Sequence, residues 1–171
     1  MSAAGKASRN DKGLSRSQAR LAAVQALYQM DLAETDLAAV IEEFKAHRLG
    51  SDADNGVGNG PDNSTGAEAD PEHFAGVLKG VVRRQREIDP MIDQQLAQGW
   101  RLTRIDSILR AILRAGTFEL MELEDVPPRV IISEYIDVAH AFFEGDEPRV
   151  VNGVLDSLAR KLRPGALPER G

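Results

Sequence analysis

The chain has 171 residues, of which 42% are hydrophobic and 28% charged, and its formal net charge is −6 at pH 7. This composition is typical of a globular protein with one domain or two small packed lobes. No apolar run approaches the roughly 20 residues needed to cross a bilayer, and no apolar signal-peptide segment follows the N-terminal charges. The absence of cysteine excludes disulfides and thiolate metal sites. We therefore expect a cytoplasmic protein without membrane contact.

The negative net charge conceals a basic N-terminal segment. Within residues 1–20, five cations stand against one acid, which leaves this segment at +4 and the rest of the chain at −10. The cations are Lys6, Arg9, Lys12, Arg16 and Arg20. A basic segment on an acidic protein favours contact with a polyanion, although such tails are also often only solvated arms. Charge alone leaves both interpretations open, and we expect residues 1–14 to form a flexible basic arm.

Residues 15–32 predict the first helix. Four of its apolar residues are spaced three or four positions apart and share one face: Leu21, Val24, Tyr28 and Leu32. Arg16 and Arg20 continue a row with Tyr28 at steps of four residues. This row could bind RNA, because arginine donates to phosphate and tyrosine stacks on bases. Alternatively, Tyr28 could belong to the core, with the aliphatic arginine stems covering it.

A second helix and an inserted loop are predicted next. Asp36 can cap a helix that begins at Leu37 and stops at Gly50. Residues 50–70 are rich in glycine and acids and contain neither lysine nor arginine. Because this segment can bury little apolar surface, we expect a disordered acidic loop.

Five more helices are predicted after the loop. They begin at proline or capping signals, which are Asp70-Pro71, Asp89-Pro90, Thr103 to Asp106, Pro127-Pro128 and Pro148. The helix from Ile105 to about Leu123 is apolar around most of its circumference, so we expect it to be central and buried. Gly116 within it suggests that another helix crosses close to its backbone. About seven helices and no strand pattern predict an all-α bundle of antiparallel helix pairs.

The sequence contains no catalytic or metal-binding pattern. The three histidines fall on three different predicted helices: His47, His73 and His140. There is no glycine-rich phosphate loop and no GxSxG turn. Glu134 and Asp137 can share a helix face, but without a nucleophile or a second cluster they are more typical of a solvated surface. We expect no enzyme activity, no catalytic residue, no metal and no cofactor.

Four segments together resemble the NusB family of bacterial transcription antitermination proteins. They are RLAAVQALYQMDL, GWRLTRIDSILRAILRAGTFEL, DVPPRVIISEYIDVAHAFF and VVNGVLDSLARKLRP. Their order and spacing match the family over most of residues 15–164. The resemblance implies two small packed helical subdomains, without catalysis. It predicts one RNA-binding domain over residues 15–164, followed by a flexible tail over 165–171.

The resemblance also implies a function and partners. Proteins of this family bind the single-stranded boxA element of ribosomal RNA leader transcripts together with the ribosomal protein NusE. The pair helps to build an antitermination complex on RNA polymerase. By this resemblance the expected RNA-binding residues are Lys12, Arg16, Arg20, Gln25, Tyr28, Arg149 and Asn152. We expect the three arginines to contact phosphates, Lys12 to add electrostatic attraction, and the three other residues to meet bases or sugars.

The chain departs from the family at three places. Val150 stands where the family often has phenylalanine, and base stacking on an aromatic ring is typically worth about 1–3 kcal/mol. Ser17 and Gln18 interrupt the arginines, and Ser133 replaces a common asparagine without an assignable consequence. The first two departures predict weaker RNA binding by this chain alone, for which a partner bound to the same RNA can compensate.

Two other interpretations stay open. Related helical domains occur at the N-terminus of ribosomal RNA methyltransferases, although this chain has no glycine-rich cofactor loop. The second interpretation is a module that binds only protein and forms dimers. The sequence does not decide between a monomer and a homodimer. The Asn152-Gly153 pair could likewise serve close helix packing instead of RNA.

Overall fold

The computed structural model describes residues 4–46 and 69–169, and for residues 4–14 the backbone alone. These residues contain no strand and six helices: α1 (Ala4–Ala33), α2 (Leu37–Phe44), α3 (Pro71–Gln95), α4 (Ser107–Glu122), α5 (Pro128–Phe142) and α6 (Glu147–Leu162). The predicted all-α class is confirmed. Apart from its last two residues, the loop predicted to be disordered over 50–70 lies outside the described residues.

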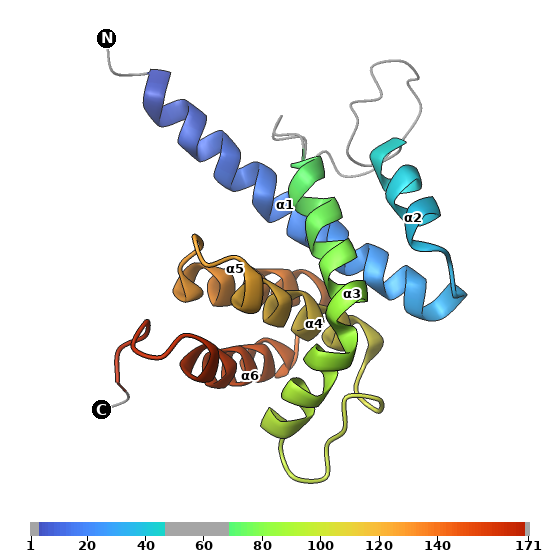
Figure 1. Cartoon of the computed structure of the whole chain (residues 1–171), viewed down its shortest axis with the longest axis vertical. Coiled ribbons are helices and arrows are strands. Elements are labelled where there is room, and N and C mark those ends of the chain that lie inside the picture. Colours follow the sequence, from blue (N-terminus) through green and yellow to red (C-terminus); the bar gives the residue numbers. More distant parts are fainter. Residues whose placement is uncertain (1–3, 47–68, 170–171) are drawn as a thin grey trace.

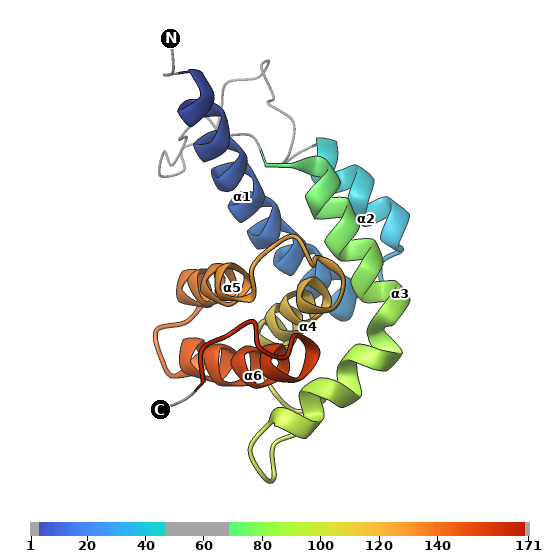
Figure 2. The same ribbon diagram turned by 60° about the vertical axis from the view of Figure 1, so that its left-hand side comes forward.

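Helix α4 is the centre of the fold. It packs against α1, α3, α5 and α6, and its Ile112 and Leu113 are fully buried. On one side of it α5 and α6 pack as a pair, and on the other α2 lies against α1 and α3 (Figure 1, Figure 2). The central, buried position predicted for this helix is therefore confirmed.

The first helix begins earlier than the sequence pattern indicates. We expected it to start at residue 15 after a flexible arm, but the backbone is helical from Ala4. No proline interrupts residues 4–14, and adding turns to a helix already held by packing costs little compared with starting a new one. The arm and the first helix are thus continuous in backbone conformation.

Pro90 does not begin a separate helix, as we had expected. Helix α3 continues through it from Pro71 to Gln95, although proline removes one backbone hydrogen bond. Ile88 and Ile92 are both fully buried, so packing holds the helix on either side of the proline. Figure 2 shows α3 bending between its two halves, as a helix with an internal proline commonly does.

Two glycines let helices approach α4 closely. A Cβ atom at Gly116 would lie 2.8 Å from a methyl carbon of Leu155 in α6, which confirms the close crossing predicted there. A Cβ atom at Gly80 in α3 would overlap the ring of Phe118, which is 4% exposed in α4. At both positions the close helix contact is possible only because glycine has no side chain.

We expect Gly80→Ala to lower the free energy of unfolding by about 1–3 kcal/mol, because the new methyl group must displace the buried ring of Phe118. Gly76→Ala, one turn earlier in α3, is the matched control. No atom lies within 4 Å of its Cβ position, so alanine should stabilise the helix by up to about 1 kcal/mol. Urea unfolding of both variants measures the contrast, and equal effects would contradict a tight contact at Gly80.

Candidate nucleic-acid interface

Arg20 lies inside the fold and not on its surface. It is 2% exposed, and its Nε and Nη2 atoms each donate to the carboxylate of Glu119 at 2.9 Å. Each step of four residues turns a helix by about 40°, so the row from Arg16 rotates toward α4 at Arg20. The prediction that Arg20 contacts a phosphate is therefore wrong, because its guanidinium is enclosed and already paired.

Arg20 belongs to a buried polar cluster contributed by four helices. Its members are Ser17, Arg20, His73, Glu119, Glu134 and Tyr135. The hydroxyl of Tyr135 donates to Glu119, and Nε2 of His73 lies 3.4 Å from the same carboxylate. The hydroxyl of Ser17 donates to Glu134 at 2.7 Å. The cluster thereby ties the middle of α1 to α3, α4 and α5.

The residues around Glu119 determine its charge. Burial by itself would raise the pKa of Glu119, but His73 and Arg20 outweigh burial and lower it to about 2. Burial, followed by the charge of Glu119, raises the pKa of Tyr135 well above 10. At neutral pH the carboxylate is therefore ionised and accepts hydrogen bonds, while the phenol is neutral and donates one.

The remaining predicted residues of α1 do not form one face. Arg16 is exposed, whereas the side chain of Lys12 lies outside the described residues. Gln25 is partly buried and lies nine positions after Arg16, which places the two residues about half a turn apart around the helix. Arg16 and Gln25 thus point in opposite directions from α1, and one nucleotide cannot contact both.

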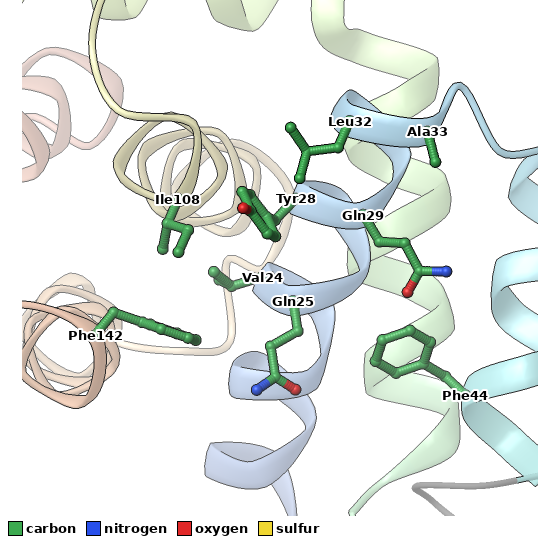
Figure 3. Close-up of a pocket in the computed structure, with 9 residues that line it drawn as sticks. All are labelled: Val24, Gln25, Tyr28, Gln29, Leu32, Ala33, Phe44, Ile108 and Phe142. Atoms are coloured by element: carbon green, nitrogen blue, oxygen red, sulfur yellow. The ribbon is translucent and has the colours of Figure 1, made fainter.

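Gln25 and Tyr28 line a largely apolar hollow of about 440 Å³, which we call the tyrosine hollow. Figure 3 shows the ring of Tyr28 lying toward Ile108 of α4, with Phe142 of α5 facing it across the opening. Tyr28 is partly exposed, while its neighbour Val24 is fully buried. Tyr28 therefore combines the two roles left open by the sequence, since one part of it packs and another reaches solvent.

The predicted residues of α6 are exposed beside a second hollow. Arg149 and Asn152 are three positions apart and share an outward face near the start of the helix. Val150 is partly buried and lines a hollow of about 440 Å³ together with Trp100. We call this second depression the tryptophan hollow.

The start of α4 separates the two hollows. Ile108 lines the tyrosine hollow, whereas its neighbours Ile105 and Leu109 line the tryptophan hollow. Val150 and Tyr28 therefore lie on adjoining parts of the surface, although α6 follows α1 by more than a hundred residues.

Sequence reasoning missed three residues of this surface. Trp100 is 52% exposed, and Arg101 and Arg104 are exposed beside it on the same hollow. The signal was present in the sequence, since the one tryptophan of the chain stands next to an arginine in a turn that follows Gly99. Aromatic and arginine side chains interleaved in this way are typical of surfaces that bind single-stranded nucleic acid.

The described residues offer little support for other kinds of site. Among them, no group of three histidine, aspartate or glutamate side chains is arranged to hold a metal ion. Nor does any helix in residues 4–46 or 69–169 combine the length and apolarity of a membrane span.

Comparison with known proteins gives a consistent result. The NusB family model matches residues 17–160. The transcription antitermination protein NusB of Bartonella henselae is 51% identical over 148 residues, which cover 86% of this chain and 89% of that one. The protein of the same name from Agrobacterium fabrum is 50% identical over 148 residues, covering 86% and 85%.

Solved structures share the fold. A structure of T. maritima NusB has a TM-score of 0.68 and 27% identity, and the match covers 87% of this chain and 93% of that one. A crystal structure of antitermination factors NusB and NusE in complex with dsRNA has a TM-score of 0.63 and 24% identity, covering 86% and 97%. At that lower identity the second likeness concerns the fold alone.

Proposed function

The chain belongs to the NusB family, and from this premise we propose that it is a transcription antitermination factor. It binds single-stranded boxA RNA of ribosomal RNA leader transcripts together with the ribosomal protein NusE, as part of an antitermination complex on RNA polymerase. The observation that carries the proposal is the 51% identity over 148 residues to a protein named for this function. The chain acts in the cytoplasm as a non-catalytic scaffold, with residues 15–164 as its RNA-binding domain.

Five of the seven residues expected from the sequence keep their proposed roles, since three of them are exposed and two are partly exposed. Arg16 and Arg149 contact phosphates, and Asn152 meets a base or sugar beside Arg149. Gln25 and Tyr28 contact the RNA from the tyrosine hollow. Lys12 contributes electrostatic attraction, and Arg20 instead holds α1 against the core.

We expect Arg16→Ala and Arg149→Ala each to weaken boxA binding and to reduce the slope of log affinity against log salt concentration by about 0.7, because each loses one contact to a single-strand phosphate. Fluorescence anisotropy of labelled boxA RNA with NusE, at several salt concentrations, measures both quantities. Arg86→Ala is the matched control, since it removes an exposed arginine from α3.

Two outcomes would contradict parts of this proposal. Unchanged affinity and slope in both arginine variants would remove these residues from the interface. A scrambled boxA sequence bound as tightly as boxA would leave only nonspecific electrostatic binding.

A further inference from the structure

Trp100 stands between two depressions of the surface. It lines the tryptophan hollow and also a smaller hollow of about 210 Å³ that is bounded by Leu96 and Gly153. Val150 lines both depressions as well. The half-exposed indole ring therefore lies next to the aliphatic residue of α6 that stands between Arg149 and Asn152 in sequence.

The loop that carries Trp100 is held in place by its own backbone. Gly99 has φ +88°, a conformation that favours glycine in a tight turn, and the N–H of Trp100 donates to Ala97 at 2.9 Å. Leu102 is 1% exposed, and its N–H donates to the carboxylate of Asp93 at 2.8 Å. The backbone that carries the indole is thus held before any ligand arrives, which lowers the entropy lost on binding.

Three arginines near the ring can contact phosphates, and three acids line the same hollow. Arg101 and Arg104 are exposed on the tryptophan hollow, and Arg149 is exposed beside Val150. One acid of the hollow, Asp106, is already used, because its carboxylate accepts the N–H groups of Ile108 and Leu109 as the cap of α4. Two other acids line the hollow, Asp146 and Glu147.

Glu147 offers a specific hydrogen-bond acceptor. Its Oε2 atom is buried and has no hydrogen-bond partner among the described residues. A buried acceptor without a protein partner is costly unless water or a bound group donates to it. An ionised carboxylate only accepts hydrogen bonds, so the group that fits is an N–H donor such as the exocyclic amine of a nucleobase.

We propose that Trp100 stacks on one base of single-stranded RNA and that Glu147 accepts a hydrogen bond from the exocyclic amine of that base. Arg101 and Arg104 contact the flanking phosphates. Through this hydrogen bond the site prefers a base with an exocyclic amine, which is cytosine, adenine or guanine, over uracil, whose one donor is its ring N3–H. This inference rests on the proposed function, and it supplies beside Val150 the aromatic face that position 150 lacks.

The single tryptophan of the chain makes the stacking directly measurable. We expect boxA RNA to quench the tryptophan fluorescence. The dissociation constant from quenching should equal the one measured by anisotropy of labelled RNA. Trp100→Ala should weaken RNA binding by about 5- to 150-fold, whereas Trp100→Phe, which keeps a stacking ring, should retain most of the affinity. Because the side chain is half exposed, both variants should keep the unfolding midpoint of the wild type.

The outcomes separate this inference from the proposed function. If the wild-type chain does not bind boxA RNA even with NusE, the proposed function fails. If it binds without quenching and Trp100→Ala has wild-type affinity, only the inference is overturned. A Trp100→Ala variant that loses NusE and keeps RNA would assign the hollow to a protein partner and would also overturn it.

Base selection is tested at Glu147. Wild-type protein is expected to bind oligocytidylate at least about 5-fold more tightly than oligouridylate, and Glu147→Gln should reduce that preference. Glu144→Gln, at an exposed acid in the loop just before α6, should leave the preference intact. If Glu147→Gln strengthened both oligonucleotides equally, Glu147 would act only by charge repulsion and its proposed role would be refuted.

Discussion

Arg20→Ala is expected to lower the free energy of unfolding by about 3–5 kcal/mol. The change leaves the carboxylate of Glu119, which is 0% exposed, ionised and without the guanidinium that binds it through three hydrogen bonds. Tyr135 and His73 cannot replace the lost charge pair, because Tyr135 is neutral and His73 contacts the carboxylate at only one atom. Urea unfolding followed by circular dichroism measures the loss.

Arg16→Ala provides the matched comparison, since it removes an exposed arginine one turn earlier in α1. It should change the free energy of unfolding by no more than about 0.5 kcal/mol. A double variant, Arg20→Met with Glu119→Gln, removes both charges and should recover part of the stability lost in Arg20→Ala. Equal losses in Arg16→Ala and Arg20→Ala would contradict the buried pair.

Glu119 should make the protein sensitive to acid in a defined range. Its pKa is about 2 in the folded chain against an ordinary value of 4.5, so the unfolded chain binds the proton first as the pH falls. The stabilisation is therefore complete above about pH 4.5 and is lost as the pH falls toward 2. A shift of this size corresponds to about 3 kcal/mol of unfolding free energy.

The double variant Arg20→Met with Glu119→Gln isolates this effect, because it lacks the ionisable pair but keeps the other carboxylates. Urea unfolding of both proteins between pH 5 and pH 2 gives the difference in stability at each pH. We expect that difference to shrink by about 3 kcal/mol on acidification. A difference that stays constant over this range would show that Glu119 does not titrate as described.

Local signals predicted much of the helical framework. The side chains of Asp36, Asp70 and Asp106 accept backbone N–H groups at the starts of α2, α3 and α4, as their positions in the sequence indicated. Gly116 predicted a close helix crossing, because glycine destabilises a helix interior and close packing of another helix can offset that loss. These signals involve single residues or residues a few positions apart, so they can be recognised in a single sequence.

Features that depend on distant residues were not predictable in the same way. The sequence around Pro90 is typical of a helix start, whereas packing of the buried Ile88 and Ile92 keeps α3 continuous through it. The sequence predicts a phosphate contact for Arg20, because its true partner Glu119 lies 99 positions further along the chain and cannot be recognised from local spacing. A four-residue row gives the relative angles of side chains but not the direction in which the core lies.

The candidate surface shows the same limit. Arg149 and Asn152 were expected from the sequence, but their neighbour Trp100 comes from a loop about 50 residues earlier. Spatial neighbours from separate helices leave no periodic pattern, so only the fold brings the tryptophan to Val150.

The separation of Arg20 from Glu119 also bears on how the chain folds while the ribosome is still making it. At about 5–20 residues per second, the 99 residues between them take roughly 5–20 seconds to polymerise. Throughout that interval the arginine of α1 has no carboxylate from α4 to pair with. The cluster that joins α1, α3, α4 and α5 can therefore close only late in translation.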